Sequence, residues 1–225
     1  MYIKKDLFLN LLISTIPFTF IAGNLILNLN VFIIILFSLI FYRLKIFEGK
    51  FSSLDKLIVF FFLYIFFNGA INDYLKYSDS NTVLIKSLGY LRFLALYFII
   101  RHLVKENLIN YKFIFFFFGA ACMFVAFDLI VQHIFRQDLF GYTVGPKQRV
   151  LSGPFGDEYV AGAFIQRFFI FALYFIILFS RFKKSQTSKI LIYLSLAFFL
   201  IAALLAGNRI PLILFIFILI LFFNE

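Results

Sequence analysis

The chain has 225 residues, of which 64% are hydrophobic and only 14% are charged. An ordinary soluble domain carries about 25% charged residues, so the composition excludes a soluble globular fold, a disordered chain and a nucleic-acid-binding domain. The net charge of +10 would favour a nucleic-acid partner in a soluble protein, but here the basic residues lie between long apolar runs. The single cysteine, Cys122, excludes an internal disulfide and a cysteine-based metal site. The sequence is that of an integral membrane protein.

A helix that crosses the hydrocarbon core needs about 20 mostly apolar residues. We therefore predict an all-α, polytopic fold in which residues 1–225 form a single transmembrane domain with about eight spans. The first apolar run lacks a small-x-small cleavage site and contains Pro17, so we interpret it as a retained span rather than a signal peptide. The predicted spans are Leu7–Ala22, Leu25–Tyr42, Leu57–Ile71, Val83–Ile100, Phe113–Phe135, Tyr159–Ser180, Ile190–Ala206 and Pro211–Phe223.

The basic residues between these spans are distributed unevenly. With the N-terminus in the cytoplasm, thirteen of the 21 Lys and Arg residues fall in cytoplasmic segments and five fall outside. Positive charge accumulates on the cytoplasmic side of membrane proteins, which fixes this orientation, and most of the net charge then lies beside anionic lipid. The five outer residues are Lys76, Arg136, Lys147, Arg149 and Arg209.

The longest connection, residues 136–158, is predicted to be a periplasmic loop rich in glycine, proline and charge. Binding residues favour such loops on a rigid scaffold. Near its end, Asp157 is placed to cap the sixth span and Glu158 to lie in the first helical turn. These two residues either have a purely structural role or form part of a site. Arg149 lies eight residues before Asp157. A guanidinium beside a helix N-terminus makes an anion-binding site.

The turn between the last two spans contains a second outer arginine. Gly207 suits a helix C-terminus, Asn208 an N-cap, and Pro211 the first turn of the next helix. Arg209 is not needed for such a turn. It either meets lipid headgroups or joins Arg149 in holding a phosphate or pyrophosphate.

Four Lys, Arg or Asp residues fall inside predicted spans, where charged groups are costly and usually face a partner or a wet cavity. From a rise of 1.5 Å per residue, Arg92 and Arg167 lie roughly 15 Å and Asp128 roughly 10 Å below the outer surface; Lys86 lies nearer the outer edge. We predict that Asp128 pairs with Arg92 or Arg167, either as a structural ion pair or in a functional site. The positive surplus favours an outward-open cavity for an anionic ligand.

Small residues at Gly119 and at Ala202–Ala203 predict close helix packing. No His, Cys, Asp or Glu cluster has metal-ligand spacing and no glycine-rich nucleotide loop is present. We therefore expect no metal and no cofactor.

The loop resembles that of the O-antigen ligase and O-antigen polymerase family of bacterial envelopes. The residues that carry the resemblance are Gln132–Gly141, Arg149–Glu158 and the Gly207-Asn208-Arg209 turn. The resemblance implies a metal-independent glycosyltransferase of the bacterial inner membrane. Such an enzyme takes a glycan from undecaprenyl pyrophosphate on the periplasmic face and transfers it to lipid A-core or to another glycan. The family's pyrophosphate-binding arginines map to Arg149 and Arg209.

The sequence departs from the family in length. Family members usually have ten to twelve spans and a large outer loop in their second half, which carries a catalytic histidine in ligases. We expect this chain to be either an N-terminal fragment or a diverged protein without full activity, and we assign no catalytic residue. The substrate-binding candidates are Arg149, Arg209, Arg92, Arg167, Lys86, Asp157 and Glu158. A transporter or flippase for an anionic lipid or sugar is the alternative function.

Overall fold

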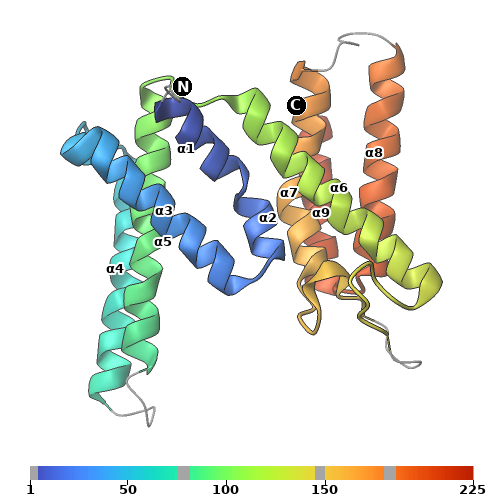
Figure 1. Cartoon of the computed structure of the whole chain (residues 1–225), viewed down its shortest axis with the longest axis horizontal. Coiled ribbons are helices and arrows are strands. Elements are labelled where there is room, and N and C mark those ends of the chain that lie inside the picture. The colour runs from blue at the N-terminus through green and yellow to red at the C-terminus, as the bar shows by residue number, and fades with distance from the viewer. Residues whose placement is uncertain (1–4, 76–81, 145–149, 180–185, 225) are drawn as a thin grey trace. The chain divides into compact units, whose positions relative to one another are not determined.

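The computed structural model describes residues 5–75, 82–144, 150–179 and 186–224. These ranges are helical apart from turns, loops and one isolated β-bridge between Gln137 and Thr143 (Figure 1). The helices are α1 (Lys5–Ser14), α2 (Ile16–Ile21), α3 (Asn24–Tyr42), the 3₁₀-helix η1 (Arg43–Phe47), α4 (Ser53–Tyr74), α5 (Thr82–Lys105), α6 (Tyr111–Phe135), the 3₁₀-helix η2 (Gly153–Phe155), α7 (Ala161–Phe179), α8 (Gln186–Leu205) and α9 (Arg209–Asn224).

The predicted all-α fold is confirmed over the described residues, and their helices indicate a polytopic membrane protein. Among the described residues, five helical segments are long and apolar enough to cross a membrane: Asn24–Phe47, Ser53–Tyr74, Val83–Lys105, Tyr111–Phe135 and Ala161–Leu178. Two further apolar helices, Lys189–Leu205 and Arg209–Leu221, are shorter than a full span and coincide with the last two predicted segments.

The first apolar run does not form the continuous span that the sequence predicts. The helix breaks at Thr15, so that α1 ends at Ser14 and α2 begins at Ile16. Pro17 lies in the first turn of α2, where its missing N–H costs nothing, whereas in the middle of a helix its ring would clash with the preceding turn. The proline therefore starts a new helix instead of interrupting an old one.

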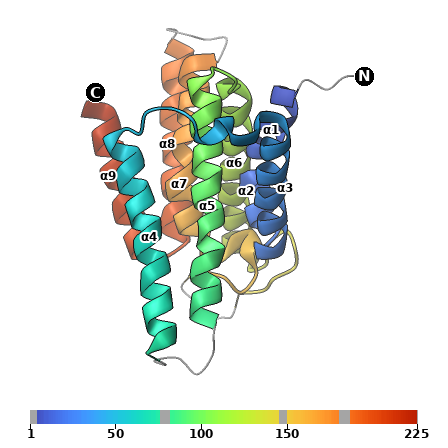
Figure 2. The same ribbon diagram turned by 90° about the vertical axis from the view of Figure 1, so that its left-hand side faces the viewer.

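The chain divides into two compact units, and the break at Thr15 falls close to a boundary between them. Unit 1 comprises Met1–Ile13 and Leu27–Ile109. Its α4 and α5 run side by side as an antiparallel pair (Figure 2). The pair is tight because Gly69 has no side chain: a Cβ there would collide with Ser87.

Unit 2 comprises Ser14–Ile26 and Asn110–Glu225 and holds the larger apolar core, built by α6, α7, α8 and α9. Gly119 on α6 lies against Ala172 on α7, where an added Cβ would be 2.9 Å from the Ala172 Cα. Ala202 and Ala203 on α8 are buried in the same core. The predicted small-residue packing is confirmed at these positions.

Candidate functional site

The loop after α6 begins with a turn organised by Asp138. Arg136 ends α6 in the left-handed conformation, with a φ of 59°, and Asp138 follows two residues later. One carboxylate oxygen of Asp138 accepts the backbone N–H groups of Phe140 at 3.0 Å and Tyr142 at 2.7 Å. A short aspartate side chain that bonds its own following backbone is the usual way to hold such a turn. Residues 138–142 therefore have a defined shape at the end of α6.

Asp128 holds the same turn from inside α6. Its side chain is fully buried, and its Oδ1 accepts the Leu139 N–H at 2.8 Å. Among the described residues, its Oδ2 atom has no hydrogen-bond partner, and neither does Oδ2 of Asp138, which is only 5% exposed. The expected ion pair between Asp128 and Arg167 is wrong because the Arg167 side chain is exposed and Asp128 faces the loop backbone. Arg92, the other predicted partner, belongs to unit 1.

Gln132 fastens the second half of the loop. Its Oε1 accepts the Gly153 N–H at 2.9 Å, and its Nε2 lies 3.4 Å from the Ser152 hydroxyl oxygen. Gly153 has a φ of +56°, and a Cβ there would be 3.3 Å from Leu129. The segment Leu151–Pro154 is buried, so this half of the loop is part of the core of unit 2.

The starts of α7 and α9 lie side by side next to this loop (Figure 1). The Asn208 side chain donates to the Tyr159 carbonyl at 2.8 Å, and a Cβ on Gly162 would be 3.2 Å from the Cβ of Ala206. Arg209 is the first residue of α9 and is exposed. The N-termini of α7 and α9, whose first backbone N–H groups have no partner within their own helix, therefore meet next to an exposed guanidinium.

Asp157 and Glu158 are exposed in the loop that precedes α7. The predicted cap at Asp157 and the placement of Glu158 in the first helical turn are wrong, because α7 begins only at Ala161. The backbone of Glu158 instead closes a turn by donating to the Phe155 carbonyl at 3.1 Å. The helix starts later because Gly156 has a φ of 62° and a ψ of −116°, far from helical values.

Three of the other predicted binding residues are described, and they lie on α5 and α7. Arg149 lies outside the described residues. Arg167 is exposed on α7, while Lys86 and Arg92 both belong to unit 1. Lys86 is exposed on α5, and the Arg92 guanidinium lies 4.8 Å from the centre of the Phe93 ring. Of the predicted candidates, the structure brings Arg209 and the Asp157–Glu158 pair to the same end of unit 2.

Two adjoining hollows open between α2 and the loop of unit 2. The larger, of about 680 Å³, is mainly apolar, and the smaller, of about 210 Å³, reaches Glu158. Four residues line both: Ile21, Ala22, Tyr142 and Pro154. Phe18, Phe124 and Phe140 complete the apolar wall of the larger hollow.

Unit 1 contains a buried charge cluster that the sequence analysis missed. Asp55 is 2% exposed, and its Oδ1 accepts the Tyr97 hydroxyl at 2.6 Å and lies 3.1 Å from Nε of Arg101. Its Oδ2 accepts the Ser52 N–H at 2.6 Å, while Ser52 caps α4 in return. The spacing Ser-x-x-Asp before an apolar run was the available signal, because it is typical of a capping box.

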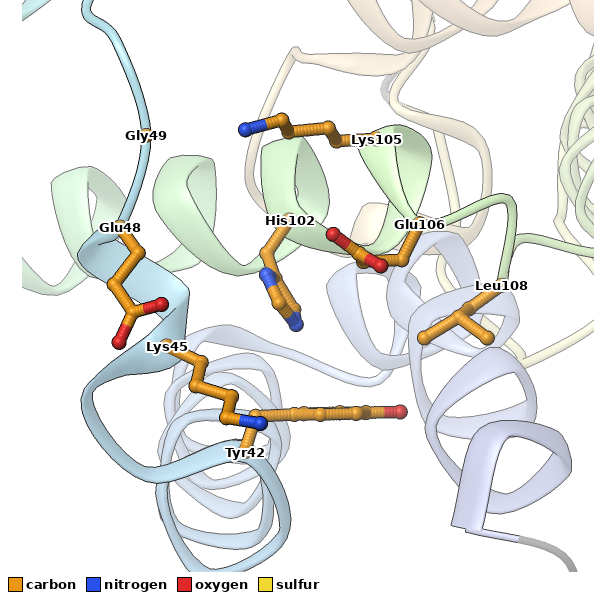
Figure 3. Close-up of a pocket in the computed structure, with 8 residues that line it drawn as sticks. All are labelled: Tyr42, Lys45, Glu48, Gly49, His102, Lys105, Glu106 and Leu108. Atoms are coloured by element: carbon orange, nitrogen blue, oxygen red, sulfur yellow. The ribbon is translucent and has the colours of Figure 1, made fainter.

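A polar hollow of about 500 Å³ lies at the same end of unit 1 (Figure 3). Its floor is Tyr42, whose hydroxyl donates to Asp6 at 2.6 Å, and His102, whose ring packs edge-on against that of Tyr42 at 5.0 Å. Charged side chains of both signs stand around this floor. The lining residues are Tyr42, Lys45, Glu48, Gly49, His102, Lys105, Glu106 and Leu108.

Comparisons with protein families, with curated proteins and with solved structures find no match to this chain. Over the described residues, no group of three or more His, Cys, Asp or Glu side chains is placed to hold a metal ion. What the chain does must therefore be argued from the geometry of its own residues.

Proposed function

We propose that this chain belongs to a membrane glycosyltransferase that takes a glycan from a polyprenyl diphosphate, with undecaprenyl pyrophosphate as the carrier. The observation that supports this most strongly is the Asn208–Tyr159 hydrogen bond, which joins the starts of α7 and α9 beside the exposed Arg209. A diphosphate needs several N–H donors and a forked cation, and this end of unit 2 offers both. Arg149 enters the loop eight residues before Asp157 and is proposed to complete the site.

The chemistry follows from the charge that develops on the carrier. An acceptor hydroxyl attacks the anomeric carbon of the glycan, a new glycosidic bond forms, and the bond from that carbon to the diphosphate oxygen breaks. The leaving diphosphate gains negative charge, which Arg209, Arg149 and the helix N-termini stabilise. A base that we do not assign to this chain removes the hydroxyl proton. The reaction has two products. One is the acceptor, either lipid A-core or another glycan, with the transferred glycan attached, and the other is undecaprenyl pyrophosphate.

The apolar hollow beside the loop supports the lipid half of this proposal. Phe18, Phe124 and Phe140 line it, and the smaller hollow that adjoins it reaches Glu158 just before α7. A polyprenyl chain would bury its first isoprene units there by the hydrophobic effect. The diphosphate at the head of that chain would then lie toward the starts of α7 and α9.

The proposal includes a topology. We infer about eight spans in a bacterial inner membrane, with the N-terminus in the cytoplasm and residues 136–158 in the periplasm. The helix order within unit 2 supports this arrangement, because the end of α6 and the starts of α7 and α9 meet at one end. The alternative function, transport of an anionic lipid or sugar, has no separate support among the described contacts.

Glycan transfer by the natural full-length protein tests the proposal. Arg209→Ala and Arg149→Ala should each abolish transfer from the undecaprenyl-pyrophosphate-linked glycan while the protein stays at its normal level in the membrane. The matched control is Arg136→Ala, which removes an exposed arginine from the end of α6 and should leave transfer intact. Normal transfer by Arg209→Ala would contradict the proposed site.

A further inference from the structure

The polar hollow of unit 1 lies where two candidate spans end. The segments Asn24–Phe47 and Val83–Lys105 are long and apolar enough to cross the membrane, and the hollow is lined by their last residues and by residues that follow them. Apolar helices of this length end at the level of the lipid headgroups. The hollow therefore faces the layer in which phosphates and headgroup amines are concentrated.

The floor of the hollow is held by contacts within unit 1. The Asp6 side chain accepts a hydrogen bond from the Tyr42 hydroxyl, and the Asp6 carbonyl accepts one from the Asn10 side chain. The same Asn10 side chain also donates to the Leu108 carbonyl at 2.8 Å. Figure 3 shows the His102 ring between Tyr42 on one side and Lys105 on the other. The floor thus does not need a ligand to keep its shape.

The walls of the hollow carry four charged side chains, two lysines and two glutamates. Over the described residues, Lys45, Glu48, Lys105 and Glu106 form no ion pair within 4.0 Å, although Asp55 and Arg101 do so in the same unit. Figure 3 shows the two lysine and two glutamate side chains spread around the hollow rather than paired with one another. Two positive and two negative groups around one cavity suit a ligand that itself carries both charges.

We propose that this hollow binds the headgroup of a zwitterionic phospholipid that has a primary amine, of the phosphoethanolamine type. Lys45 and Lys105 hold the phosphate, and Glu48 and Glu106 accept hydrogen bonds from the ammonium group. His102 adds an N–H donor beside the phosphate. A purely anionic headgroup would leave both carboxylates without a partner, and a quaternary amine could not donate hydrogen bonds to them. This site is independent of the diphosphate site proposed in unit 2.

Lipid retention by the purified protein tests the proposal. The protein is exchanged into nanodiscs that contain phosphatidylethanolamine, phosphatidylglycerol or phosphatidylcholine, and bound lipid is counted by native mass spectrometry after release into detergent. Wild type should retain phosphatidylethanolamine in preference to the other two lipids. The double variant Lys45→Gln/Lys105→Gln should lower that retention at least tenfold, because the loss of even one charge-assisted hydrogen bond weakens binding about tenfold. Lys50→Gln, an exposed lysine outside the hollow, is the matched control and should retain lipid normally.

Two further arms complete the test. Glu48→Gln/Glu106→Gln should remove the preference for phosphatidylethanolamine over phosphatidylglycerol. The two lipids differ at this site in the ammonium group, which the carboxylates of Glu48 and Glu106 are proposed to bind. Free O-phosphoethanolamine should displace the retained lipid, which identifies the headgroup as the recognised part. Equal retention of the three lipids by wild type would overturn the proposal. If the protein binds O-phosphoethanolamine but retains no lipid, the ligand of the hollow is a free phosphoethanolamine and not a phospholipid, which would overturn the proposal.

Discussion

Replacing Gly119 with alanine should destabilise unit 2, although alanine is the better helix former. A Cβ at Gly119 would lie 2.9 Å from the Cα, 3.1 Å from the Cβ and 3.3 Å from the N of Ala172. These atoms belong to the backbone and first side-chain carbon of α7, so they yield only if the helix moves. Overpacking of this kind costs about 1–3 kcal/mol, and the helix propensity of alanine offsets about 0.5–1 kcal/mol of it. The expected net loss is therefore about 1 kcal/mol.

Thermal unfolding of the purified protein in detergent measures this loss. For a protein of this size, 1 kcal/mol corresponds to a fall in Tm of about 2–4 °C. Gly89→Ala is the matched control, because its nearest neighbour is the flexible tip of Arg92, 3.2 Å away; its Tm should stay equal or rise. A second change, Ala172→Gly, should restore part of the loss in Gly119→Ala. A Gly119→Ala protein as stable as wild type would refute the close helix contact.

Three other predictions follow from the loop and from the proposed topology. Asp138→Ala removes the acceptor of two backbone N–H groups, so hydrogen exchange should accelerate over residues 138–144; unchanged exchange there would count against the turn. Gln132→Leu leaves the buried Gly153 N–H unpaired, which should lower the free energy of unfolding by about 1–3 kcal/mol and therefore the Tm. An unaltered Tm would show that the contact is dispensable. Cys122 is fully buried, so wild type should not react with maleimide. In whole cells a cysteine at Glu158 should react directly and one at Asn107 only after permeabilisation; the reverse pattern would invert the topology.

The helices were predictable from the sequence to the extent that apolar runs define them. Most predicted segments coincide with helices because a continuous apolar run has one stable arrangement in a membrane, with its backbone bonded internally. The break at Thr15 was harder to place, since Pro17 is compatible both with a kinked span and with the first turn of a new helix. The division into two units was not predictable, because it depends on long-range contacts rather than on local pattern.

The candidate site was predictable in part. Helix-terminal signals at Asn208 led to the correct turn, and its bond to Tyr159 joins the two helix starts. Asp157 was misplaced because the loop turns once more, at Gly156, before α7 begins. The predicted pairing of Asp128 with Arg167 was wrong because a buried carboxylate can be satisfied by backbone N–H groups as well as by arginine. Sequence spacing does not distinguish these two solutions.

Carrier binding by the purified chain tests the central claim most directly. The protein is placed in nanodiscs, and its Kd is measured for undecaprenyl pyrophosphate and for undecaprenyl monophosphate, in wild type and in Arg209→Ala. Wild type should bind the diphosphate more tightly than the monophosphate, and Arg209→Ala should lose that preference while still binding the prenyl chain. Equal affinity of wild type for the two carriers, or an unchanged preference in Arg209→Ala, would contradict a diphosphate site at the starts of α7 and α9.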